Sequence, residues 1–375
     1  MALTDIDGGR LADNAFSLGK NLIINGAMQV AQRGTTSTAS NYGTVDRFFT
    51  SFSGGAVTTT QESLTSGDPY DAGFRNFVRL TNTTTATGAA NYRLLVQNCE
   101  AQNIANSGWN YASATSYVTL SFWIRSSVSQ AFSVRLRSLD GTSQNYPMST
   151  GTLTADTWTK VTKTIPGNSN ITVDNDNGAG LRVEFGAFWG TDSTDSGVTL
   201  DAWAAYSSST RTTDMTNTWA GTTNATFDIT GVQLEVGSAA TPFEHRSFDD
   251  ELARCQRYFF SSFPQGTAPG KGVANTVDLE LPATSGSFSP NRYFGLQHKQ
   301  NMRGPAAITF YNSQNASAGD NTIKGYYWVD GGATGSGDYT VNLDVAGHNA
   351  FGGWFATSGF GNAIIRFHYT ASAEL

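Results

Sequence analysis

Apolar and polar residues alternate along short segments of the chain. In "YVTLSFWIR" (residues 117–125), one face carries Val118, Leu120, Phe122 and Ile124. This period of two predicts a β-strand with one packed face. The next segment, "AFSVRLRS" (131–138), repeats the pattern and places three polar residues outward: Ser133, Arg135 and Arg137. Because "SSVSQ" between the two segments is short and turn-like, we expect them to pair antiparallel.

Similar alternation predicts further strands at 22–32, 45–53, 76–82, 91–99, 157–165, 181–189 and 225–236. In the last of these, the apolar parity slips by one residue at Thr230-Gly231, which indicates a β-bulge. Short strands separated by turns every 8–12 residues or so predict an all-β fold, a jelly-roll β-sandwich.

One segment has helical spacing instead. In "FDDELARCQRYF" (248–259), apolar residues recur every three to four positions, acids stand at the start and arginines stand later. This suits a helix and its dipole. We predict a connector helix within 247–260, and we assign it to chain connection and subunit contacts through five residues: Phe248, Leu252, Cys255, Arg257 and Tyr258.

Beyond the helix, alternation resumes at 276–282, 306–312, 325–331, 339–347 and 362–371. Glycine-rich stretches, "GGATGSG" and "GGWFATSGFG", separate the last segments and are expected to form loops. The predicted organisation is a β-sandwich over 21–246, the helix, and a smaller β domain over 261–375 that we expect to be the receptor-reading tip.

Charge and composition narrow the function. Only 14% of the 375 residues are charged, the net charge is −7, and the Lys and Arg residues are scattered singly. Such a chain is not expected to bind nucleic acid. No apolar segment approaches the roughly 20 residues of a membrane span, and no signal peptide begins the sequence. Cys99 and Cys255 have no CxxC spacing, so we expect free buried thiols made in a bacterial cytoplasm; a disulfide between them is the alternative.

The sequence carries no strong catalytic signature, because its four histidines lie in unrelated segments. A glycosidase needs two carboxylates, and Glu184, Asp192, Asp195 and Asp201 are the acids to consider. Their alternative role is to support turns.

An oxygen-rich segment, "VDNDNG" (173–178), offers Asp174 and Asp176 as calcium ligands. It departs from the EF-hand loop, since its Gly falls one place early. An Asx-rich turn is the other interpretation, and no other cofactor is expected.

Aromatic residues in polar, glycine-rich stretches are the better functional signal. A ring can cover the C–H face of a sugar while neighbouring polar groups bond its hydroxyls. The alternative is that these rings close the ends of the sandwich or pack against another subunit. The candidates for carbohydrate binding are Trp109, Tyr111, Trp203, Tyr206, Trp219, Trp328 and Trp354. Phe355 is likewise expected to be exposed.

Several segments together resemble a known family. They are "NLIINGAMQVAQRGTT", "YGTVDRF", "SFWIRSS", "TADTWTKVTKTIPG" and, most specifically, "GVQLEVG-x-x-ATPFE-x-R-x-x-x-x-EL-x-x-CQRY" within 231–258. They are similar to the β-sandwich of bacteriophage and prophage fibre proteins, and the ending "YTASAEL" is similar to fibre C-termini. The resemblance covers roughly residues 20–260 and the last few residues.

This resemblance implies a virion-surface fibre or spike on a tail or capsid, including head spikes of gene-transfer particles. It implies a jelly roll similar to carbohydrate-binding modules, a homotrimer, no enzymatic activity, and attachment to other virion proteins through residues 1–20. Three hypotheses follow. The protein binds host surface polysaccharide during adsorption, it is a structural decoration or connector protein, or it is a capsule depolymerase that uses acids such as Asp192 and Asp195.

Overall fold

The computed structural model describes residues 19–273, 279–285, 291–312, 314–328, 334–356 and 363–375. Contacts divide the chain into two compact units. The first comprises Met1–Ala27, Ser51–Val57 and Ser63–Arg246, and the second comprises Met28–Thr50, Thr58–Glu62 and Ser247–Leu375.

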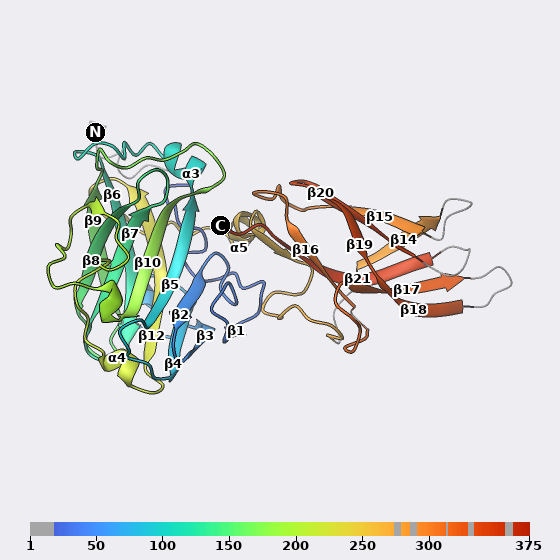
Figure 1. Cartoon of the computed structure of the whole chain (residues 1–375), viewed down its shortest axis with the longest axis horizontal. Coiled ribbons are helices and arrows are strands. Elements are labelled where there is room, and N and C mark those ends of the chain that lie inside the picture. Colours follow the sequence, from blue (N-terminus) through green and yellow to red (C-terminus); the bar gives the residue numbers. More distant parts are fainter. Residues whose placement is uncertain (1–18, 274–278, 286–290, 313, 329–333, 357–362) are drawn as a thin grey trace, which may run out of the picture. The chain divides into compact units, whose positions relative to one another are not determined.

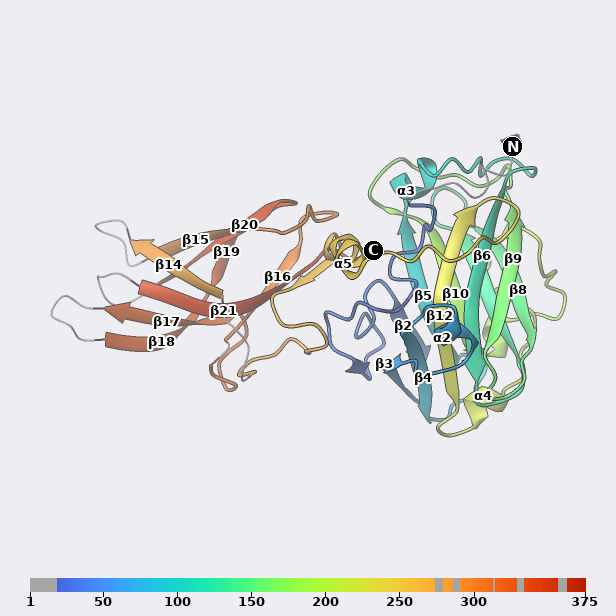
Figure 2. The same ribbon diagram turned by 180° about the vertical axis from the view of Figure 1, so that it is seen from behind.

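Two six-stranded sheets form a β-sandwich (Figures 1 and 2). The first sheet has the order β1 (Thr36–Ser37), β3 (Ala56–Ser63), β4 (Asn76–Thr84), β12 (Thr226–Val236), β6 (Tyr117–Ser126) and β9 (Thr159–Pro166). The second has the order β11 (Ala204–Ala205), β8 (Gln144–Thr152), β7 (Ala131–Ser138), β10 (Ala179–Trp189), β5 (Tyr92–Glu100) and β2 (Phe49–Ser53). The predicted all-β sandwich is confirmed.

The core lies between the sheets, where alternating apolar residues meet. Phe122 of β6 and Phe185 of β10 have ring centroids 4.9 Å apart, and Phe132 of β7 lies 5.0 Å from Phe227 of β12. The four apolar residues predicted to share one face of 117–125 are all fully buried. Period-two patterning therefore identified the inward face correctly.

Four short elements complete the first unit. They are α2 (Asp68–Asp71), α3 (Ala101–Ala105), the 3₁₀ turn η1 (Thr191–Ser193) and α4 (Thr218–Gly221). Helices α3 and α4 lie at opposite ends of the sandwich in Figures 1 and 2. None of the helices seen in the described ranges has the length and apolar character that crossing a bilayer needs.

The predicted pairing of 117–125 with 131–138 is wrong. Strand β6 pairs with β12 and β9, whereas β7 pairs with β10 and β8 in the opposite sheet. Alternation specifies which face of a strand is buried but not which strand lies beside it. The link through Gln130 therefore crosses from one sheet to the other.

The predicted strand at 22–32 is also wrong. Asn25 and Met28 have φ values of 62° and 57°, which an extended strand excludes. The segment is an irregular turn whose backbone binds β12, through Leu22 N to Leu234 O at 2.8 Å and Val232 N to Gly26 O at 2.9 Å.

The phase slip in 225–236 is confirmed as a β-bulge. The register between β12 and β6 shifts between Thr230 and Gln233, and Gly231 has a φ of 63°. A Cβ at Gly231 would meet the Phe74 ring at 2.7 Å. Glycine is needed here for both its backbone conformation and its size.

The second unit contains a nine-stranded sheet. Its main order is β18 (Thr334–Thr340), β17 (Thr322–Trp328), β21 (Ala363–Ser372), β14 (Leu279–Ser285), β15 (Asn291–Gln297), β20 (Ala350–Ala356) and β19 (Asn342–Ala346), and β13 (Phe259–Ser261) and β16 (Ala307–Tyr311) also pair with β21. Strands β18 and β20 run through the stretches expected to be glycine-rich loops, because extended backbone tolerates glycine when neighbouring strands pair with it. Parts of the predicted strands, residues 276–278, 329–331 and 362, lie outside the described residues.

The connector helix is confirmed as α5 (Phe248–Gln256), which begins at an N-cap where Ser247 Oγ accepts a hydrogen bond from Asp250 N at 3.2 Å. It groups with the second unit, as do residues 28–50 and 58–62. The predicted sandwich range of 21–246 therefore needs this correction: residues 28–50 and 58–62 belong to the C-terminal unit.

That segment is held inside the second unit by ion pairs. Arg33 Nη2 lies 2.9 Å from a Glu374 carboxylate oxygen, and the buried Arg47 guanidinium pairs with the same carboxylate. The Arg47 guanidinium also lies 3.5 Å from the centroid of the Tyr258 ring. The last residues of the chain thus stabilise a segment more than 300 positions earlier.

Candidate saccharide site

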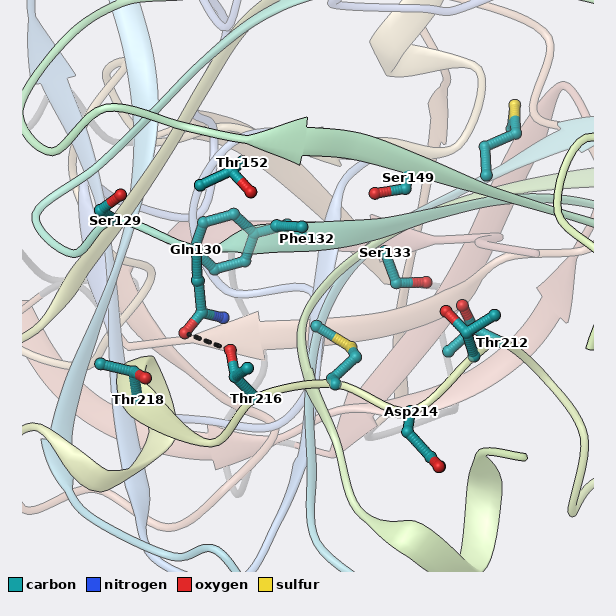
Figure 3. Close-up of a pocket in the computed structure, with 14 residues that line it drawn as sticks. Ser129, Gln130, Phe132, Ser133, Ser149, Thr152, Thr212, Asp214, Thr216 and Thr218 are labelled. Carbon is teal, nitrogen blue, oxygen red and sulfur yellow. Dashed lines mark hydrogen bonds between the residues drawn. The ribbon is translucent and has the colours of Figure 1, made fainter. Parts of the chain in front are cut away.

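A cavity of about 330 Å³ opens on the outer face of strands β7 and β8 (Figure 3). This volume lies at the lower end of the range that small-molecule sites occupy. Residues 129–133 and 148–152 form one wall and residues 212–218 form the other. The lining is Ser129, Gln130, Ala131, Phe132, Ser133, Met148, Ser149, Thr152, Thr212, Thr213, Asp214, Met215, Thr216 and Thr218.

The strand pattern explains the polar floor. Along β7, Phe132 packs into the core, so its neighbour Ser133 faces outward and pairs with Ser149 of β8. Eight of the fourteen lining residues are serine or threonine. Their hydroxyl groups donate and accept hydrogen bonds, as a polyhydroxylated ligand requires.

Hydrogen bonds from a neighbouring turn hold the opposite wall. Asp195 N donates to Thr212 O at 3.1 Å, and Thr194 Oγ1 donates to Asp214 Oδ1 at 2.6 Å. In Figure 3 the Asp214 carboxylate points away from β7. It is the only carboxylate among the lining residues.

Two buried polar atoms at this cavity have no hydrogen-bond partner among the described residues: Gln130 Nε2 and Ser133 Oγ. Each residue is only 4% exposed. The other amide atom of Gln130 is occupied, since Oε1 accepts from Trp219 N at 2.9 Å and from Thr216 Oγ1 at 3.5 Å (Figure 3). An unpaired buried donor costs about 1–3 kcal/mol, so both atoms favour a ligand with acceptor oxygens.

Arginines and aromatic rings cover the neighbouring part of the same sheet face. The Arg137 guanidinium lies 3.4 Å from the Tyr206 ring centroid, and Arg211 lies 4.6 Å from that of Trp189. Arg135 forms a buried ion pair with Glu184, whose other oxygen lies 3.7 Å from Arg182. Arginines that are far apart in the sequence therefore lie together on one face of the sheet, although the sequence suggested that they are scattered.

These arginines outnumber the acids beside them. Arg135 and Arg182 share Glu184, and neither Arg137 nor Arg211 forms an ion pair among the described residues. Burial lowers the pKa of Arg137, and the neighbouring Arg182 and Arg135 lower it further against the opposing effect of Tyr206 and Glu184. The face has an excess of positive charge although the chain is acidic.

The aromatic candidates have different environments. Trp109 and Trp219 are buried, so their predicted exposure is wrong; the Trp219 indole N–H donates to Thr226 O at 2.9 Å. A ring with polar neighbours in the sequence can still be buried when its loop folds back onto a sheet. Phe355 is likewise buried in the core of the second unit.

The remaining rings are partly accessible. Tyr111, Trp203 and Tyr206 are half-buried in the first unit, and Trp354 is half-buried in the second. Trp203 donates its indole N–H to Pro166 O at 2.6 Å and packs 5.1 Å from Tyr146. Only Tyr206 joins the arginine face; the side chain of Trp328 lies outside the described residues.

The candidate calcium segment forms a turn bound to its surroundings. Asp176 Oδ1 accepts from Gly178 N at 2.8 Å, and Asp174 N donates to Asp140 Oδ2 at 2.9 Å. In the part of the chain that the structure describes, no three His, Cys, Asp or Glu side chains are grouped to hold a metal. Calcium binding at Asp174 and Asp176 stays a prediction.

The candidate catalytic acids are not assembled at the cavity. Asp192, Asp195 and Asp201 are exposed, and none lines it. Glu184 lies on the outer face of β10 but is buried beside its arginine partners.

The motif of 231–258 makes contacts within the chain, and the predicted subunit contacts through the helix stay a prediction. Glu244 accepts from Asn21 N at 2.7 Å and pairs with Arg246. Cys255 and Tyr258 are fully buried, Leu252 and Arg257 are half-buried, and Phe248 is 41% exposed. Both cysteines are free and buried, as predicted.

Sequence reasoning missed Gln130, Ser133, Arg135, Arg137 and Arg211 as site residues. The alternation correctly placed Ser133 and the β7 arginines on the outward face. Nothing in the local pattern indicated that residues 203–218 would cover that face.

Neither a scan against protein-family models nor a search of curated proteins finds a match. Solved structures that resemble part of the chain include an enzymatically active domain of bacteriophage CBA120 tailspike protein 4, with 11% identity, 58% of this chain covered and a TM-score of 0.31. This match spans only 22% of the tailspike chain.

Two sugar-binding structures are similar to the same extent. A putative sugar-binding protein from Bacteroides thetaiotaomicron has 13% identity, covers 58% of this chain and all of its own, and gives a TM-score of 0.31. A family 22 xylan-binding domain from Paenibacillus barcinonensis has 12% identity, 60% and 100% coverage, and a TM-score of 0.30. Similarity at this level shows neither a common function nor a shared site.

Proposed function

We propose that this chain is a virion fibre or spike protein that binds a host cell-surface polysaccharide through the cavity on β7 and β8, without catalysis. The observation that carries the proposal is the cavity itself. It is lined mainly by hydroxyl groups, and two buried polar atoms in it, Gln130 Nε2 and Ser133 Oγ, lack partners among the described residues. A saccharide supplies the acceptor oxygens that such atoms require.

The virion role rests on the resemblance of residues 231–258 and the other quoted segments to phage fibre proteins. A homotrimer attached to other virion proteins through residues 1–20 would present three cavities per fibre. Weak binding at each cavity is then sufficient, because linked sites raise avidity by orders of magnitude.

The lining argues for binding over hydrolysis. Glycoside hydrolysis ordinarily uses two carboxyl groups about 5–10 Å apart, and this cavity has Asp214 alone. A purely structural decoration protein has no need of an open polar cavity, so no observation favours that alternative.

Replacing Ser133 by Ala should weaken saccharide binding without destabilising the fold. The substitution removes a hydroxyl that makes no bond within the described chain, so stability should be unchanged or slightly higher. Binding to the recognised polysaccharide should fall about 3- to 10-fold, the equivalent of one neutral hydrogen bond. The readouts are thermal unfolding and a microarray of bacterial surface polysaccharides.

Ser121 provides the matched control. It is also 4% exposed and also lies on a strand, β6 of the other sheet, and does not line the cavity. Ser121→Ala should bind as the wild type does. Equal binding by Ser133→Ala and wild type, with both folded, contradicts the assignment of this cavity.

A further inference from the structure

The unpartnered atoms around the cavity share one chemical property. Gln130 Nε2, Trp189 Nε1 and the Nε atoms of Arg135, Arg137 and Arg211 are all donors, and the Ser133 hydroxyl can also donate. Among the buried side-chain atoms of this face that the structure describes, no amide or carboxylate oxygen is unpartnered. The site is therefore short of acceptors.

Two of the residues with unpartnered donors, Trp189 and Ser133, lie close together. A Cβ placed on Gly186 would lie 2.8 Å from Trp189 Nε1 and 3.3 Å from Ser133 Cβ. Gly186 pairs with Ser133 across β10 and β7, so the Trp189 indole packs against Gly186 next to the Ser133 side chain. The indole therefore lies beside Ser133, which lines the cavity.

Positive charge surrounds the same end. Arg211 stacks on Trp189 and immediately precedes Thr212, which lines the cavity wall. Arg135 lies 5.2 Å from the same ring centroid, but Glu184 already neutralises it. Arg211 does not itself line the cavity, but it is half-buried and forms no ion pair among the described residues, so its positive charge beside the cavity has no counter-charge there.

Asp214, the one carboxylate of the lining, is not placed to repel an anion at the Ser133 end of the cavity. One oxygen of Asp214 accepts from Thr194, and the side chain points away from β7 (Figure 3). Arginine with neutral N–H donors is the combination that binds carboxylate, sulfate and phosphate groups.

We infer that the cavity selects an acidic saccharide, whose anionic group lies at the Ser133 end and is bound by Arg211 with the nearby N–H donors. This inference rests on the proposed function and adds the class of ligand. A neutral glycan would leave the arginine excess without a counter-charge.

The test uses the full chain and a microarray of neutral and acidic bacterial polysaccharides. The glycans bound by the wild type should be acidic. Removing the acidic group of a bound glycan, by carboxyl reduction or by hydrolysis of a sulfate or phosphate ester, should weaken binding about 10-fold or more, because a charge-assisted bond is lost.

Variants identify the residue. Arg211→Gln should lose about 10-fold in affinity for the acidic polysaccharide, and Arg211→Lys should lose less because it keeps the charge. Both should bind the neutralised polysaccharide as the wild type does, a result that general misfolding cannot give. Lys160→Gln, which removes an exposed charge on β9, should leave binding unchanged.

The possible failures are distinguishable. Preferential binding of neutral glycans, or equal binding before and after neutralisation, overturns the acidic specificity and leaves the proposed function standing. Binding of no glycan on the array contradicts the proposed function and this inference with it.

Discussion

The buried Asp46 makes the stability of the second unit depend on pH. Burial raises the pKa of Asp46 to about 6, against the lowering effects of Arg33 and of hydrogen bonds from Gln32. The folded state therefore holds a proton at pH values where the unfolded chain has lost it. The stabilisation is complete below about pH 4, declines as pH rises to about 6, and is absent above that.

Asp46→Asn removes this titration while keeping an oxygen that can accept from Gln32 N, a bond of 3.0 Å in the structure. The difference in unfolding free energy between wild type and variant should therefore change by up to about 3 kcal/mol between pH 4 and pH 7, with the wild type relatively less stable at pH 7. Urea unfolding at both values measures it. A difference that is the same at both pH values would show that Asp46 does not titrate in this range.

Single-residue chemistry was only partly predictable from the sequence. The outward position of Ser133 and Arg135 followed from alternation, and the free thiols followed from cysteine spacing. The burial of Trp109 and Trp219 did not, because side-chain burial depends on segments distant in sequence. Gln130 was not predicted either, because its place at the cavity depends on the crossing of the chain from one sheet to the other.

At the scale of elements, the bulge in β12 depends on Gly231. Alanine there must adopt a positive φ and place its Cβ 2.7 Å from the buried Phe74 ring. Gly151, with a φ of 71° and no atom within 4 Å of its Cβ position, is the matched control. Gly151→Ala should cost about 1 kcal/mol and Gly231→Ala about 1–3 kcal/mol more.

Chemical denaturation of both variants tests this expectation. Equal costs would mean that the Phe74 ring moves aside freely and that the bulge needs glycine only for its backbone conformation.

Strand positions were predicted better than strand partners. Segments such as 131–138 and 225–236 match observed strands closely because one face of each packs into the core. Which strands pair depends on where the chain crosses between sheets, and such crossings leave no local sequence pattern. Strand β8 was not predicted because both of its faces are largely covered, so its residues do not alternate. The alternation at 22–32 resembled a strand, but residues with positive φ, such as Asn25, turn the backbone there.

At the scale of the whole molecule, the proposed fibre is a trimer. Light scattering of the purified chain should give three times the chain mass of 40.0 kDa. A mass of one chain at micromolar concentration would remove the avidity that weak cavities require.

Saccharide binding by the cavity is the central claim, and filling the cavity tests it most directly. Ser149→Trp places a large ring on the cavity floor, whereas Thr162→Trp places the same ring on an exposed position of β9 outside it. Polysaccharide binding by the full-length wild type and both folded variants is the measurement. The account predicts binding by the wild type and Thr162→Trp and its loss in Ser149→Trp; undiminished binding by Ser149→Trp would contradict it.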